Sequence, residues 1–180
     1  MISILKPAKD PSLPSSYRPI SILDTIGKLF EKILLARILH VVSKRGLMCN
    51  EHFGFRPRHS TSMQLARLIE RITRNLGKKR LTGIVFLDMA KAFDTTWIDG
   101  LLYKLTLLNF PSYIVRTISS YLRGWMFKAS FQTAMLSCRG MGAGVAQGGL
   151  ISAFLFSLYI NNMPSPWHHI ESTVIIFARA

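Results

Sequence analysis

The segment that most constrains the fold is an apolar run that ends on an acidic residue, GIVFLDMAKAFDTTW at residues 83–97. The apolar side chains from Ile84 to Leu87 predict a buried strand over residues 82–88. Asp88 closes this run, in a chain with only nine acidic residues. A carboxylate at the end of a buried strand costs free energy unless a cation compensates it. Two interpretations are open from these residues alone: Asp88 caps the next segment with Lys91 as its ion-pair partner, or it binds a metal ion.

The rest of the chain mixes helical and extended patterns without a regular strand–helix–strand rhythm. Four prolines predict a strand–loop–strand unit over residues 1–22. Helices are predicted at about 24–44, 60–76, 111–123 and 150–160, and further strands at 126–133 and 172–177. This mixture predicts an α+β fold.

The first two predicted helices carry apolar residues at helical spacing, which predicts that each packs one face on a core. In the first helix these residues are Ile26, Leu29, Phe30, Ile33, Leu34 and Val41. In the second they are Leu65, Leu68, Ile69, Ile72 and Leu76. The helix at 111–123 carries Ile114, Val115, Ile118 and Leu122, and the run LISAFLFSLYI at 150–160 predicts a helix buried in the core.

The chain is strongly basic, and the excess charge is uneven. Its formal net charge is +14 over 180 residues. Residues 1–90 hold 16 basic and 6 acidic side chains, and residues 91–180 hold 7 and 3. This balance favours a polyanionic partner, nucleic acid before membrane. A basic protein without such a partner is the alternative that charge alone leaves open.

Several other classes of protein are disfavoured. The two cysteines, Cys49 and Cys138, have neither zinc-site spacing nor a disulfide framework, which favours a reducing, intracellular compartment. No signal peptide is expected, because the apolar start soon meets Lys6 and Pro7. The longest apolar run is about half of what a membrane span needs, so no membrane partner is expected.

Six segments resemble, in sequence and in order, the reverse transcriptase domain of non-LTR (LINE-type) retrotransposons, and most of all the jockey group. They are SSYRPISILDTIGKLFEKIL, FGFRPRHST, FLDMAKAFDTTW, LLYKL, SYLRG and GVAQGG. The resemblance implies an RNA-directed DNA polymerase with the fingers and part of the palm of a right-hand polymerase. Residues 1–80 would be the fingers-like region and residues 81–180 mainly palm, with the thumb and the endonuclease domain absent. Its partners would be an RNA template, a DNA primer and a deoxynucleoside triphosphate, and its location the nucleus.

Within this resemblance, Asp88 matches the first catalytic carboxylate of the palm. In the family, clustered carboxylates hold two Mg²⁺ ions that join the primer 3′-hydroxyl to the incoming nucleotide. Phe93 matches the bulky residue that lies under the sugar and disfavours a 2′-hydroxyl, with core packing as the alternative. Asp94 is expected to be a structural carboxylate that accepts hydrogen bonds from nearby backbone.

The resemblance also assigns basic residues to substrates. Lys6 and Arg18 match fingers residues that grip the triphosphate, a role suited to guanidinium because it can bond two oxygens at once. Solvated surface charge is an equal alternative for Lys6. Arg56 and Arg58 are expected to touch the template backbone.

The segment GVAQGG matches the second palm motif. Gln147 and Gly148 would approach the nucleotide and template there, because glycine lets backbone come close to a ligand. The chain has Ala146 where the family usually has proline.

The resemblance fails at the third palm motif, where the family has an aromatic residue followed by Ala-Asp-Asp. The chain reads VIIFARA, so Arg179 and Ala180 stand at the two degenerate catalytic positions. We expect Arg179 to be the cation that compensates Asp88, and we expect the chain not to polymerise DNA. A decayed or truncated copy, or a sequence error, would give this ending. The chain could instead be a non-catalytic nucleic-acid-binding module, or it could fail to fold stably.

Overall fold

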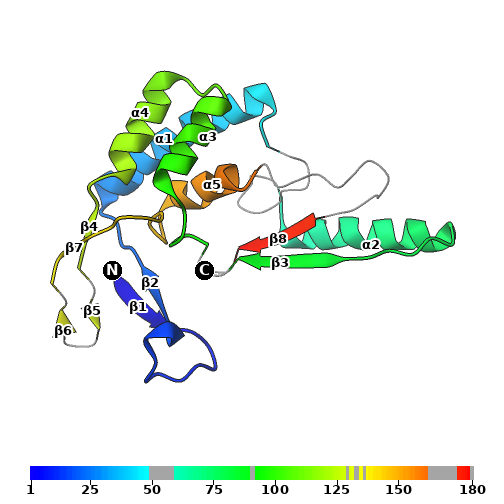
Figure 1. The fold of residues 1–180 in the computed structure, drawn as a ribbon, viewed down its shortest axis with the longest axis horizontal. Helices are drawn as coiled ribbons and strands as arrows, with labels where there is room; N and C mark the ends of the chain where they lie inside the picture. The colour runs from blue at the N-terminus through cyan, green and yellow to red at the C-terminus, as the bar shows by residue number, and fades with distance from the viewer. Residues whose placement is uncertain are drawn as a thin grey trace.

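The computed structural model describes residues 1–48, 59–89, 92–128, 130–131, 134–135, 137–161 and 174–178. These residues form a cluster of helices and three small sheets, one of four strands and two of two strands (Figure 1). The predicted α+β class is confirmed. The helices are α1 (Thr25–Arg45), α2 (Thr61–Gly77), α3 (Ile98–Leu107), α4 (Ser112–Leu122) and α5 (Leu150–Tyr159).

Local sequence sets the ends of the two long helices. The Asp24 side chain accepts a hydrogen bond from the Gly27 N–H at 2.7 Å and so caps α1. Gly46 ends the same helix in the left-handed region, at φ +59°. The Ser60 hydroxyl caps α2 by accepting from the Met63 N–H at 3.2 Å. These starts and stops confirm the predicted positions of both helices.

The core lies where α1, α3, α4 and α5 meet. Contacts join α1 to α5, α3 to α4 and α3 to α5. Leucines and isoleucines that are at most 1% exposed fill the space: Ile38, Leu101, Leu105, Ile114, Ile118, Leu122, Ile151, Leu155 and Leu158. The buried helix expected at 150–160 is confirmed as α5. Pro111 is the N-cap of α4 rather than its first helical residue, because its ψ of 133° is extended.

The apolar face expected for the first helix was largely wrong. The face of α1 that α5 and its neighbours cover carries Glu31, Leu34, Ile38 and Val42. Ile26, Leu29, Phe30 and Ile33 are exposed instead. Because apolar residues surround this helix on all sides, spacing alone did not indicate which side would meet the core.

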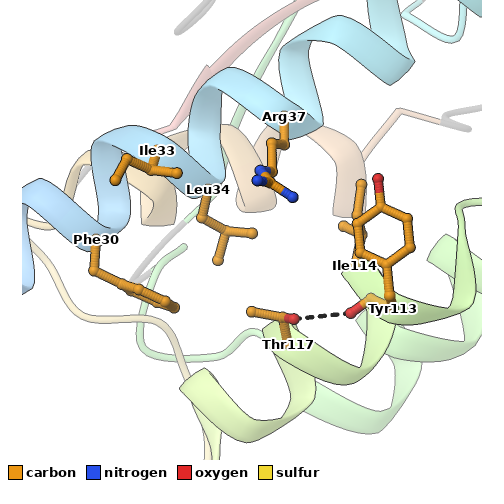
Figure 2. Close-up of a pocket in the computed structure, with 7 residues that line it drawn as sticks. All are labelled: Phe30, Ile33, Leu34, Arg37, Tyr113, Ile114 and Thr117. Carbon is orange, nitrogen blue, oxygen red and sulfur yellow. Dashed lines mark hydrogen bonds between the residues drawn. The ribbon is translucent and has the colours of Figure 1, made fainter.

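A pocket of about 250 Å³ opens between the exposed side of α1 and α4 (Figure 2). Phe30, Ile33 and Arg37 line it from α1, and Tyr113 and Thr117 line it from α4. The Thr117 hydroxyl donates a hydrogen bond within α4, to the Tyr113 carbonyl, at 2.8 Å. None of the predicted site residues lines this pocket.

The second helix also departs from its predicted packing. Leu68 is buried, together with the polar side chains of Gln64 and Asn75. The predicted core residues Leu65 and Ile69 are more than half exposed, and so is Leu76. Within the described part of the chain, no helix or strand makes an extended contact with α2, which leaves most of its apolar residues exposed.

The four-stranded sheet joins the N-terminus to the middle of the chain. Its order is β2-β1-β5-β6, from β1 (Ile2–Leu5), β2 (Tyr17–Ile20), β5 (Ser130–Phe131) and β6 (Ala134–Met135). Strands β1 and β2 are antiparallel, which confirms the predicted strand–loop–strand, and the short 3-10 helix Pro14–Ser16 lies between them.

The single strand predicted at 126–133 was wrong. Strand β4 (Met126–Phe127) pairs with β7 (Arg139–Gly140), whereas Ser130 in β5 pairs with Ile2 in β1. The alternation of apolar and polar residues there fits extended backbone but does not specify a partner strand. The chain therefore changes sheet between Phe127 and Ser130.

The third sheet pairs β3 (Val85–Met89) with β8 (Val174–Ala178) in parallel. These are the strands expected at 82–88 and 172–177, and both are confirmed with ends shifted by a few residues. In Figure 1, β3 and β8 lie side by side, on the same side of the helical cluster as α2. Among the described residues, no helix has both the length and the apolar character to cross a membrane.

Candidate functional site

The strand pair β3–β8 brings the first predicted catalytic carboxylate beside the degenerate motif. Asp88 lies opposite Phe177, and Met89 lies opposite Ala178. Because the strands are parallel, their last residues, Met89 and Ala178, lie at the same edge of the sheet. Arg179 and Ala180, the next residues after β8, lie outside the described residues, as do Arg56 and Arg58.

The β1–β2 hairpin places Lys6 and Arg18 on one face. Ile4 lies directly opposite Arg18, and the Lys6 N–H continues the ladder by donating to the Ser16 carbonyl at 2.8 Å. Residues two apart in a strand share a face, so Lys6 and Arg18 lie diagonally across the hairpin. The Lys6 ammonium donates to the Ser15 carbonyl at 3.0 Å. Their role in binding a triphosphate stays a prediction.

The Gln147–Gly148 turn lies against the end of that hairpin. The Ser21 N–H, just after β2, donates to the Gln147 carbonyl at 2.7 Å. Gly148 has φ +106°, and a Cβ at this position would lie 2.8 Å from the Ser21 carbonyl oxygen. The close approach expected at this glycine is therefore made here to the protein's own backbone. This contact joins the basic hairpin to the turn, two parts that the sequence predicts to meet the nucleotide.

A second backbone contact ties the segment after β3 to the same loop. The Val145 N–H donates to the Phe93 carbonyl at 2.8 Å, and the Gly144 N–H donates to the Thr96 carbonyl at 2.9 Å. The Phe93 ring is buried and packs on Phe156 of α5, with ring centroids 5.4 Å apart. Core packing, the alternative for Phe93, is what its side chain does in this structure, and its contact with a sugar stays a prediction.

Asp94, the neighbour of Phe93, has an exposed side chain. Its expected structural role also stays a prediction.

Sequence reasoning missed Glu31, whose side chain is 0% exposed. Its carboxylate accepts hydrogen bonds from the Tyr121 hydroxyl and from the Leu150 N–H, the latter at 2.8 Å. Burial raises the pKa of the Tyr121 hydroxyl well above its ordinary range, and the hydrogen bond and negative charge of Glu31 raise it further. The spacing of Glu31 from Leu34 and Ile38, three and seven residues, was the signal that this carboxylate faces the core.

Comparison with known proteins agrees with the family resemblance that the sequence motifs indicate. The sequence profile of a family described as "Reverse transcriptase (RNA-dependent DNA polymerase)" matches residues 4–178. The chain belongs to the reverse transcriptase family.

Curated relatives of this reverse transcriptase chain come from transposable elements of flies. It is 37% identical over 163 residues to the "Probable RNA-directed DNA polymerase from transposon X-element" of Drosophila melanogaster, covering 91% of this chain and 18% of that protein. It is 37% identical over 165 residues to the "RNA-directed DNA polymerase from mobile element jockey" of Drosophila funebris, covering 92% and 18%. The predicted likeness to the jockey group is confirmed. The chain spans less than a fifth of the length of these relatives.

The donor atoms of this reverse transcriptase chain do not fit a site for two Mg²⁺ ions. Such ions need several hard oxygen ligands, mainly carboxylates. The part of the chain that the structure describes holds no cluster of three or more His, Cys, Asp or Glu side chains. At the two positions after β8, the sequence supplies the guanidinium of Arg179 and the methyl group of Ala180. Asp88 is the one carboxylate that remains from the predicted ligand set.

Proposed function

We propose that this chain is the reverse transcriptase region of a transposon-encoded RNA-directed DNA polymerase, and that it binds a template–primer duplex without extending the primer. In this proposal residues 1–80 act as fingers, and residues 81–180 act as part of the palm. The parent activity joins a primer 3′-hydroxyl to a deoxynucleoside triphosphate on an RNA template, with Mg²⁺ as its cofactor. The element copies itself in the nucleus.

The β3–β8 register supports the proposed loss of activity. It pairs Asp88 with Phe177, so the residues expected to complete its metal site are the two that follow Ala178. These are Arg179 and Ala180. In the proposal, the Arg179 guanidinium pairs with Asp88 and supplies the positive charge that a metal ion supplies in the parent enzyme, so an ion pair takes the place of the metal site.

Calorimetric titration with Mg²⁺ tests this step without depending on catalysis. The parent chain is compared with the double variant Arg179→Asp/Ala180→Asp, and with Asp88→Ala as the control. We expect measurable Mg²⁺ affinity only in the double variant, because only that chain has three carboxylates at the strand ends. Equal Mg²⁺ affinity in the parent and the double variant would contradict the proposal.

Binding of the duplex depends on the chain's own basic groups. Lys6 and Arg18 share one face of the β1–β2 hairpin, and the Gln147–Gly148 turn lies at its end. In the proposal Arg18 binds phosphate oxygens, Lys6 adds positive charge, and the turn presents backbone to the nucleotide and the template base. Arg56 and Arg58 contact the template backbone.

The uneven charge supports the proposed binding of nucleic acid without catalysis. Residues 1–90 carry 16 basic against 6 acidic side chains. Contacts to phosphates release counterions, so affinity for an RNA–DNA hybrid should fall steeply between about 50 mM and about 200 mM salt. Fluorescence anisotropy with a labelled hybrid measures this fall.

The variants of that experiment separate binding from catalysis. Arg18→Ala should weaken binding, whereas Asp88→Ala should leave it unchanged or tighten it by removing a negative charge. Binding that ignores salt, or that is lost in Asp88→Ala, would contradict the proposal.

A further inference from the structure

Glu31 is a buried carboxylate whose described surroundings hold no basic side chain paired with it. The two ion pairs among the described residues join Arg74 to Glu70 and Arg123 to Asp99. A buried carboxylate is costly unless donors satisfy it. Here the donors are the Leu150 N–H and the Tyr121 hydroxyl. Leu150 is the first residue of α5, so the positive end of that helix also faces the carboxylate.

The approach of Glu31 to α5 requires the glycine that precedes the helix. A Cβ on Gly149 would lie 2.6 Å from Glu31 Oε1 and 2.8 Å from the Ser152 hydroxyl oxygen. At these distances a Cβ would displace the Glu31 carboxylate and the Ser152 hydroxyl from their present positions. Gly149, the last glycine of GVAQGG, therefore leaves room for the carboxylate of α1 at the N-terminus of α5.

The same short segment is held at its other end by β2. Gln147 accepts the hydrogen bond from Ser21, and Gly148 lies against the Ser21 carbonyl. Two residues later, Leu150 donates to Glu31. The Gln147–Gly148 turn is thus fixed between two anchors, the end of the basic hairpin and the buried carboxylate of α1.

We propose that Glu31 is a positioning residue that sets the Gln147–Gly148 turn for contact with the nucleotide and template. The inference rests on the proposed function, which assigns that contact to the turn. A carboxylate suits the task because each of its two oxygens accepts from a different donor. A glutamine has only one acceptor oxygen, and its NH₂ group would face a donor at the other position.

The test compares Glu31→Gln with a control that has a similar cost in stability. Ile38→Val is that control, because Ile38 lies on the same buried face of α1, about 10 Å along the helix from Glu31, and the change removes one buried methyl group. Two quantities are measured on the full chain, at a temperature where both variants are folded. One is the exchange rate of the Leu150 amide proton by NMR, and the other is affinity for the RNA–DNA hybrid by anisotropy.

The expected result is specific to the glutamine variant. Exchange of the Leu150 amide should be about tenfold faster than in Ile38→Val, since a lost bond to a charged acceptor is worth at least about 1.4 kcal/mol, a factor of ten. Hybrid affinity should fall about fivefold or more, while Ile38→Val binds like the parent. Faster exchange of the Leu150 amide without a loss of affinity for the hybrid would mean that Glu31 only stabilises the fold. That result would overturn the inference.

Tyr121→Phe is a second variant for the same test, to be used if Glu31→Gln does not fold. It removes one donor to Glu31 but keeps the ring that stacks on Phe30 and meets the edge of Trp125. It should move both measurements in the same direction by a smaller factor, and hybrid affinity equal to that of the parent would overturn the inference. A parent chain that fails to bind the hybrid would instead overturn the proposed function, and the positioning role with it.

Discussion

Replacing Gly148 with alanine should strongly destabilise the fold, for two separable reasons. The backbone at Gly148 has φ +106°, a conformation that L-residues with a Cβ rarely adopt. The added Cβ would also lie 2.8 Å from the Ser21 carbonyl oxygen and 3.2 Å from Cγ2 of Ile20. Because the first of these atoms is backbone, it cannot rotate away.

The magnitude can be estimated from these two effects. The strained conformation costs about 1–2 kcal/mol for a residue with a Cβ. Relieving the clash requires Ser21 to move, which breaks the 2.7 Å hydrogen bond from its N–H to Gln147 and costs a further ~0.5–1.5 kcal/mol. Gly148→Ala should therefore lower the free energy of unfolding by about 1.5–3.5 kcal/mol.

Two other glycines supply matched controls for urea unfolding followed by circular dichroism. Gly46 also has a positive φ, +59°, but nothing lies within 4 Å of its missing Cβ, so Gly46→Ala reports the conformational cost alone. Gly77 is the last residue of α2 and has open space with no positive φ, so Gly77→Ala should be neutral or slightly stabilising. The difference between the variants at 148 and 46 reports the contact with Ser21 together with the less favourable φ of residue 148.

The order of the three urea unfolding midpoints tests whether residue 148 lies against Ser21. The structure predicts Gly148→Ala lowest, Gly46→Ala in between, and Gly77→Ala near the parent. Equal midpoints for Gly148→Ala and Gly46→Ala would refute the close approach of the turn to β2, and with it the joined site. A parent chain without a cooperative transition would support the hypothesis that the chain does not fold stably.

Three further predictions concern stability. Leu105 is 0% exposed, so Leu105→Ala should lower the free energy of unfolding in urea by about 2–5 kcal/mol. Tyr103→Ala, at an exposed position of α3, should lower it by less than about 0.5 kcal/mol. Similar losses in the two variants would contradict the position of the core. Arg123→Ala breaks an exposed ion pair with Asp99 and should lower the free energy of unfolding by less than about 1 kcal/mol, with no remaining effect in high salt. A larger loss of stability that does not depend on salt would contradict this prediction. Because burial raises the pKa of Tyr121 above its ordinary 10.0, the unfolded chain loses this proton first, so the stability that the protonated group contributes is complete below about pH 10 and is lost as the pH rises further. Tyr121→Phe should flatten that alkaline fall, and an unchanged pH profile of urea midpoints would refute the assignment.

The sequence was most informative where local chemistry decides the structure. The ends of the first two helices were predicted closely because capping depends on a few neighbouring residues, here Asp24, Gly46 and Ser60. The strand that ends near Asp88 was predicted for a similar reason, since its run of apolar residues is short and closes on a charge. Ordered motifs then indicated the family, which composition alone could not do.

The sequence was least informative where a partner element decides the structure. Spacing on α1 favoured Ile26 and Ile33 for the core, but α5 packs on the side that holds Leu34 and Ile38. Glu31 was missed because an acidic residue in an apolar helix is normally solvated, and only the fold brings the N-terminus of α5 to it. The contact of Gly148 with Ser21 joins residues 127 apart in the chain, which no local pattern specifies.

Primer extension tests the central claim most directly. The purified chain is incubated with Mg²⁺, deoxynucleoside triphosphates and a labelled DNA primer on an RNA template, with Asp88→Ala as the control. We predict that the chain binds the duplex and extends the primer no more than the control does, because Arg179 and Ala180 supply no metal ligands. Extension above the Asp88→Ala level would contradict this claim, since the chain would then hold a working metal site that the sequence at 179–180 does not provide.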